Sequence, residues 1–251
     1  MSSHYVRSKE GGSPIQPQHS RDGLVRLGVL ALPLAGLLSF LVGLFNPIWL
    51  FEPFVFASEE PQVAAAEFLT SGFFVSQLVG TILALTLFIF GVVSLFAYLA
   101  NRSGRALALA AMVLSIVGIA LGLSGSGVAA YAGPALGKAY LGGQEETAIT
   151  VIASIIDGPW GTMSTLFFLL YSAGFILFGV GIWRSGVLPR WAGVLVAVHA
   201  PLISGPPALF GQVGSEVGSV LVVVGGGWIA LSVLRSPSSA PREAEAEPRV
   251  R

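Results

Sequence analysis

The side chain best suited to chemistry in this chain of 251 residues is His199. It lies within the apolar stretch 191–210, and imidazole changes charge closest to neutral pH. An ionisable group in such a stretch is costly and therefore indicates a function. Pro201 frees a backbone carbonyl nearby, so a water-filled cavity there would let His199 exchange protons. In a dry site the ring would instead stay neutral, as a hydrogen-bonded structural group.

Three further polar side chains lie in other apolar stretches and complete the candidate set for binding or proton exchange. These are Gln77, Tyr171 and Glu216. Tyr171 stands midway along its stretch and Gln77 near the end of its own, so each is placed to line a path or to bond between helices. Glu216 lies close enough to the end of its stretch to reach the lipid headgroups instead.

The composition removes most catalytic chemistry. The chain has no cysteine, which excludes disulfides, thiolate metal sites, iron–sulfur clusters and cysteine nucleophiles. His4 and His19 precede the first apolar stretch, so two histidines cannot ligate a haem within the membrane. The stretches hold no paired carboxylates, metal-ligand cluster or phosphate loop. We therefore expect no metal, cofactor or enzymatic activity, and the zero net charge gives no sign of nucleic-acid binding.

One tetrapeptide suggests an enzyme all the same. Gly122-Leu123-Ser124-Gly125 resembles the G-x-S-G motif of rhomboid intramembrane proteases, and the resemblance implies Ser124 as the nucleophile and His199 as its base. The helical rise places Ser124 about 27 Å and His199 about 12 Å from the same membrane face. Because a base must come within about 3 Å of its nucleophile, we disfavour this interpretation.

Spaced glycines predict close helix packing rather than chemistry. Gly118 and Gly122 lie about one helical turn apart, as do Gly214 and Gly218. This small-xxx-small spacing lets membrane helices approach each other closely. Such faces pack within the chain, or they bind a second copy or another membrane protein.

The elements that must position these side chains are long apolar segments. Hydrophobic residues make up 54% of the chain and charged residues only 10%, where soluble domains have about 25% charged residues. Segments of about 20 residues span a hydrocarbon core as helices, because lipid leaves the backbone no other hydrogen-bond partners. We therefore predict an all-α fold, a polytopic transmembrane bundle of about six helices over 23–235, with disordered tails at 1–22 and 236–251. The expected helices are 27–48, 73–100, 106–130, 160–183, 191–210 and 213–234.

The fifth stretch is the weakest of the six. Pro206 and Pro207 would break a helix that began at Arg190 after about 24 Å. Arg190 and Arg235 end on the same side whether the fifth and sixth stretches both cross or both re-enter, so the charges leave both possibilities open. Outside the membrane we expect loops at 49–72 and 131–159, with short interfacial helices at 61–70 and 145–156.

Basic residues gather on one side of the predicted bundle. With six crossings, every lysine and arginine except Lys138 falls on the side of the two termini. The positive-inside rule therefore places both termini in the cytoplasm. Tryptophans also stand at predicted helix ends, where amphipathic rings favour the headgroup layer; these are Trp49, Trp160, Trp183 and Trp191.

The turn WRSGVLPRWAG, residues 183–193, resembles a short basic turn that joins two helices in many uncharacterised bacterial membrane proteins. The resemblance covers the C-terminal part of the chain. It implies a polytopic protein of the bacterial plasma (inner) membrane and no particular activity, cofactor or catalytic residue.

We expect a small transport, channel-like or sensory membrane component whose interior is lined by His199, Tyr171 and Gln77. The alternative is a non-catalytic accessory or structural subunit that packs against another membrane protein through its glycine faces. A homo-oligomer is also compatible with these faces, and an intramembrane enzyme comes third.

The topology can be tested by cysteine labelling, because the chain has no cysteine of its own. We expect an impermeant thiol reagent to label Ser58→Cys and Thr147→Cys in intact cells. Ser103→Cys and Ser185→Cys should react only after lysis. Labelling of either of the latter two from outside would contradict cytoplasmic termini.

Overall fold

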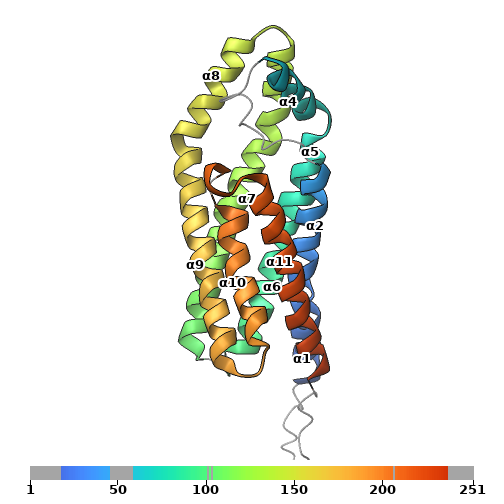
Figure 1. The fold of residues 1–251 in the computed structure, drawn as a ribbon, viewed down its shortest axis with the longest axis vertical. Coiled ribbons are helices and arrows are strands. Elements are labelled where there is room, and N and C mark those ends of the chain that lie inside the picture. The colour runs from blue at the N-terminus through green and yellow to red at the C-terminus, as the bar shows by residue number, and fades with distance from the viewer. Residues whose placement is uncertain (1–17, 46–58, 101, 103, 206, 237–251) are drawn as a thin grey trace, which may run out of the picture.

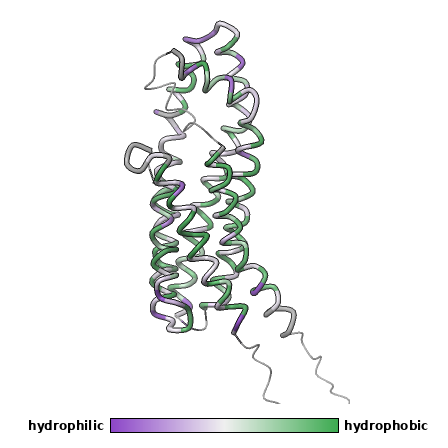
Figure 2. Tube along the Cα trace, turned by 45° about the vertical axis from the view of Figure 1, so that its right-hand side comes forward, coloured by the Kyte–Doolittle hydropathy of each residue, from purple (hydrophilic) through white to green (hydrophobic). Residues whose placement is uncertain are grey.

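The computed structural model describes residues 18–45, 59–100, 102, 104–205 and 207–236, and all regular structure in these ranges is helical. The helices run up and down an elongated bundle (Figure 1). Figure 2 shows hydrophobic residues along the middle of this bundle and hydrophilic residues towards its ends. An all-α bundle is therefore observed, as predicted.

Within the described residues, five helical segments are long and apolar enough to cross a membrane. The fifth predicted crossing corresponds to α10 (Arg190–Ser204), which has 15 residues and spans only about 22 Å. This helix ends at Gly205, whose backbone is extended (φ −67°, ψ 157°), because a residue before proline is held out of the helical region. The five long segments are Gly23–Leu44, Phe73–Leu99, Arg105–Leu141, Glu145–Ser185 and Val213–Arg235.

The first segment is a broken helix made of α1 (Gln18–Val29) and α2 (Ala31–Phe45). The break lies at Leu30 and is bridged by Leu34 N–H, which donates to the Leu30 carbonyl at 3.3 Å. α1 begins at Gln18, within the predicted tail 1–22, and residues 1–17 lie outside the described residues. The predicted residues 46–48 and Trp49 lie outside the described residues.

The start of α1 and the end of α11 (Pro207–Arg235) lie at the same end of the bundle (Figure 1). Arg26 Nη2 donates to the Ser236 carbonyl at 2.8 Å, and the hydroxyls of Tyr98 and Ser236 lie 3.4 Å apart. We call this end the arginine end. At this end the chain also turns from α6 into α7 and from α9 into α10 (Figure 1). The residues at these turns and at the end of α11 include Arg102, Arg105, Arg184, Arg190 and Arg235.

The opposite end is a helical lobe rather than a loop. Here α4 (Glu59–Ser71) packs against the far part of α7 (Arg105–Leu141), and α8 (Glu145–Ile155) returns alongside it. The chain then passes through the π-helical turn η2 (Ile156–Trp160) into α9 (Gly161–Ser185). The lobe has its own buried core of Ala65, Ala66, Leu69, Phe73, Ala129, Tyr140, Ala148 and Ile152.

This lobe corrects the prediction that the third helix ends at 130 and that a loop covers 131–159. Pro134 stands inside α7, where proline normally breaks a helix. Packing against α4 and the short helix α5 (Phe73–Ser76) holds α7 together past this proline. Gly133 faces Phe73 of α5, and a Cβ added to Gly137 would stand 2.7 Å from the carbonyl oxygen of Ala66 in α4. The expected short helices at 61–70 and 145–156 are present as α4 and α8, packed on α7.

Glycines bring the helices of the membrane bundle into backbone contact. A Cβ on Gly118 of α7 would stand 2.6 Å from the backbone nitrogen of Tyr171, and one on Gly122 would stand 3.0 Å from the Phe167 ring. A Cβ on Gly218 of α11 would stand 2.9 Å from the His199 carbonyl oxygen. Gly214 is buried. These positions therefore join helices within one chain.

Gly118→Ala should destabilise the bundle, because the methyl group meets backbone that cannot yield; overpacking of this kind costs about 1–3 kcal/mol. The matched control is Gly127→Ala on the same helix, where an added Cβ has nothing within 4 Å. That variant should be neutral or more stable by about 0.5–1 kcal/mol, because alanine favours a helix. Thermal unfolding in detergent measures both variants, and equal midpoints would contradict the close contact.

Candidate functional site

His199 lies in the centre of the bundle, on α10, and none of its surface is exposed. Its Nδ1 bonds to the Val196 carbonyl oxygen and its Nε2 lies 3.2 Å from the Tyr171 hydroxyl. A carbonyl can only accept a hydrogen bond, so Nδ1 carries the proton. A fully buried ring disfavours the charged form, and in the neutral ring Nε2 is then the acceptor, to which the Tyr171 hydroxyl donates. For the neutral ring, the hydrogen bonds therefore assign the Nδ1–H tautomer.

Aromatic rings enclose this pair. The ring of Phe88, from α6 (Ala84–Leu99), stacks on the His199 ring at 5.8 Å with an angle of 12° between the planes. Phe175 of α9 meets the His199 ring edge to face at 4.7 Å. Phe88 and Phe175 are at most 1% exposed, so the pair is shielded from solvent. We call Phe88, Tyr171, Phe175 and His199 the histidine cluster.

Helix packing explains why these side chains meet. Tyr171 and Phe175 stand one turn apart on the buried face of α9, and Phe178 and Ile182 continue that face. The backbones of α9 and α10 approach closely near the turn between them, since a Cβ on Gly179 would stand 2.7 Å from the Gly193 carbonyl oxygen. This approach brings His199 within hydrogen-bond reach of Tyr171.

Of the four candidate residues, the structure brings together only His199 and Tyr171. Gln77 stands at the start of the π-helical turn η1 (Gln77–Leu83) and is partly exposed. Glu216 lies against Gly43 of α2, and its Oε2 is buried without a hydrogen-bond partner among the described residues. The four side chains therefore do not form one common site.

The rhomboid-like pairing of Ser124 and His199 does not form in this structure. Ser124 is exposed on α7, whereas His199 is fully buried. The nitrogen that would act as a base, Nε2, already accepts from Tyr171. In addition, among the described residues no group of three or more His, Asp and Glu side chains is placed to hold a metal ion.

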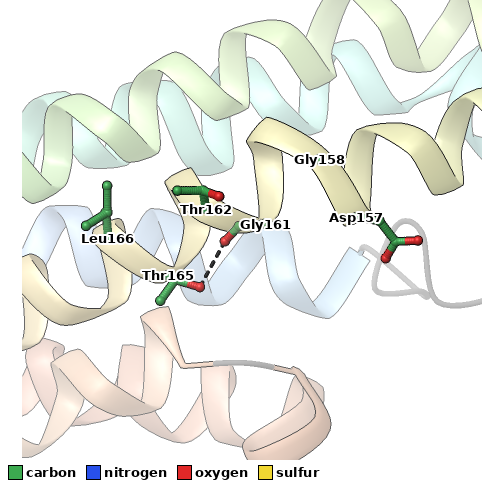
Figure 3. A pocket seen from close by; sticks show the side chains of 6 residues that line it. All are labelled: Asp157, Gly158, Gly161, Thr162, Thr165 and Leu166. Atoms are coloured by element: carbon green, nitrogen blue, oxygen red, sulfur yellow. Dashed lines mark hydrogen bonds between the residues drawn. The ribbon is translucent and has the colours of Figure 1, made fainter.

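Sequence reasoning missed an open hollow where the lobe joins the bundle (Figure 3). It has a volume of about 400 Å³ and opens to the surface. Asp157 lies at the lobe side and Leu166 further along α9, with Thr162 and Thr165 between them; Gly158 and Gly161 complete the lining. The helix is irregular here, with Gly158 at φ −101° and ψ −135° and Pro159 beside it.

The chemistry of this hollow is that of oxygen ligands. Asp157 supplies a carboxylate, and Thr162 and Thr165 supply hydroxyls, although Thr165 also donates to the Gly161 carbonyl at 2.9 Å. Carboxylate, hydroxyl and carbonyl oxygens suit small cations and polar solutes. The Asp-Gly-Pro sequence before an apolar helix is the one available sequence signal, and it is common at helix starts.

Tyr171→Phe tests the assignment of the buried ring. The change removes the donor to Nε2 and leaves a buried acceptor unpaired, which costs about 1–3 kcal/mol. The control is Tyr131→Phe, because Tyr131 is 77% exposed on α7 and its change should stay within about 0.5 kcal/mol. Nitrogen NMR of labelled histidine should show a neutral Nδ1–H ring at His199 from about pH 5 to pH 8. Protonation of the ring within that range would contradict a dry site.

A family model described as Domain of unknown function (DUF4386) matches residues 34–234. No curated protein and no solved structure matches the chain. The matched range covers three of the five long apolar segments completely, all but Arg235 of the last, and residues 34–44 of the first. It also contains the histidine cluster and the hollow. The chain therefore belongs to the DUF4386 family and is a multi-pass membrane protein.

Proposed function

We propose that this protein is a non-catalytic sensory component of the bacterial inner membrane, which responds to a small cation or polar solute. One observation carries the proposal: the hollow, with the Asp157 carboxylate in its lining, lies where η2 joins α8 of the lobe to α9 of the membrane bundle. A ligand at this junction would touch the segment that sets the angle between the two parts. Its binding would then favour one arrangement of lobe and bundle over another.

The long helices support transmission from lobe to bundle. α7 is a single helix of 37 residues, about 55 Å long. It contributes Tyr140 to the core of the lobe and Gly118 to the contact with Tyr171. Rigid elements of this kind carry coupling between distant sites when they have two arrangements. A displacement of α7 against α9 would therefore change the contacts of the histidine cluster.

The other candidate functions find less support. Transport along His199 and Tyr171 requires the helices to separate, because both side chains are fully buried and bonded to each other. An accessory subunit that docks through its glycines would have to use faces other than Gly118 and Gly218, which already pack internally. Catalysis by Ser124 would need a base other than His199.

The proposed orientation places the lobe outside the cytoplasm and the arginine end within it. Among the described residues, the lobe end carries Glu67, Glu145, Glu146, Asp157 and one basic residue, Lys138. The positive-inside rule favours this arrangement. A solute outside the cell would then reach Asp157 directly.

Thermal unfolding in detergent with added K⁺, Mg²⁺, Ca²⁺ or small polar solutes tests the hollow. At a hundredfold excess over its Kd, a ligand of the native state stabilises it by about 2.7 kcal/mol. We expect Asp157→Asn to abolish this stabilisation. The matched control is Glu67→Gln, which removes an exposed carboxylate on α4. This variant should keep the stabilisation by the ligand.

Amide hydrogen exchange separates sensing from simple binding. A bound ligand should change exchange in α10, which contributes no residue to the hollow. Binding that leaves exchange in α10 unchanged would contradict the sensory function. Absence of stabilisation by any cation or solute, or its equal loss in the Asp157 and Glu67 variants, would contradict the hollow as the ligand site.

A further inference from the structure

The arginines at the arginine end differ in what they contact. Arg26 donates to the Ser236 carbonyl, and Arg102 donates to the Tyr98 carbonyl at 3.0 Å while lying 3.9 Å over the Tyr98 ring. Arg184 and Arg190 flank the turn between α9 and α10 and are exposed. Neither forms an ion pair or donates a hydrogen bond within the part of the chain that the structure describes. Their two positive charges therefore have no protein counterion there.

Aromatic side chains hold this turn in place. Trp183 and Trp191 meet edge to face with their ring centres 6.2 Å apart, and the Arg190 guanidinium lies 5.7 Å from the Trp183 ring centre. Leu188, only 4% exposed, anchors the turn in the core. The guanidinium of Arg190 is thus positioned beside the Trp183 ring, which itself contacts Trp191. Tryptophan rings of this kind favour the layer of the lipid headgroups.

We infer that Arg184, Arg190, Trp183 and Trp191 bind the phosphate of an anionic phospholipid. A guanidinium presents paired N–H donors that match two phosphate oxygens, and it stays charged at all physiological pH values. Basic sites at the cytoplasmic ends of neighbouring transmembrane helices are suited to anionic headgroups. The indole rings then pack against the glycerol and the upper acyl chains.

The apolar surface beside the turn selects a lipid over a soluble phosphate. Val180 and Trp183 of α9 are 42% and 43% exposed, and Trp191 of α10 is 66% exposed. These side chains continue from the two arginines along the apolar helices. A single phospholipid can therefore place its phosphate at the arginines and its acyl chains against the apolar side chains. Inorganic phosphate would meet only the arginines.

Quenching of tryptophan fluorescence by brominated lipids tests the site in nanodiscs. With the wild-type chain, brominated phosphatidylglycerol should quench at a lower mole fraction than brominated phosphatidylcholine. The double variant Arg184→Gln/Arg190→Gln should lose this preference, with an affinity for phosphatidylglycerol lower by roughly tenfold or more. Arg190→Lys keeps the charge but loses the paired donors. Its affinity for phosphatidylglycerol should therefore lie between those of the wild type and the double variant.

The control is Arg105→Gln, which removes an exposed arginine from the same end without an aromatic partner. It should keep the preference for phosphatidylglycerol. Equal quenching by both lipids in the wild type, or equal loss in the Arg105 variant and the double variant, would overturn the site in favour of general charge attraction. Displacement of the brominated phosphatidylglycerol by inorganic phosphate would overturn the lipid as ligand. Unchanged thermal unfolding of each variant in phosphatidylcholine alone establishes that the comparison is between folded proteins.

Discussion

The close approach of α9 to α7 and α10 is the contact on which the rest of the bundle depends. Its backbone meets Gly118 of α7 on one side and Gly193 of α10 on the other. Lipid supplies no hydrophobic drive for helices to associate, so van der Waals contact between closely spaced backbones must hold them. The histidine cluster, the turn at the arginine end and the junction with the lobe all lie on α9 or beside it.

This packing explains how His199 can be buried inside the bundle. An imidazole inside a membrane protein is costly when its nitrogens lack partners. Here the Val196 carbonyl accepts a hydrogen bond from Nδ1–H and the Tyr171 hydroxyl donates one to Nε2, while Phe88 and Phe175 exclude solvent. His199 thus joins α10 to α9 as a neutral structural group in this arrangement. Any functional change at His199 must therefore follow a movement of the helices, and for this reason our proposal puts the ligand at the hollow beside Asp157.

Local sequence patterns predicted the fold where a single physical rule decides the outcome. Long apolar runs must be helical in lipid, and the helices were found where hydrophobicity is continuous, as in Phe73–Leu99 and Val213–Arg235. The prolines that follow Gly205 correctly marked the fifth stretch as the weak one, because proline constrains its neighbour whatever surrounds it. The prediction failed at Pro134, where contacts from α4, distant in sequence, keep α7 helical to Leu141.

The sequence by itself determined that the chain is an all-helical membrane protein without cysteine chemistry, and which side chains stand within apolar segments. These properties follow from composition and from the hydrogen-bond needs of a backbone in lipid, which act residue by residue. Only the tertiary structure decided that His199 and Tyr171 meet while Gln77 and Glu216 stand apart, and that a helical lobe and an open hollow replace the expected loop. Those features depend on how far one helix rotates and slides against another, which is set by contacts between segments distant in the chain, such as Gly179 with Gly193 and Gly137 with Ala66.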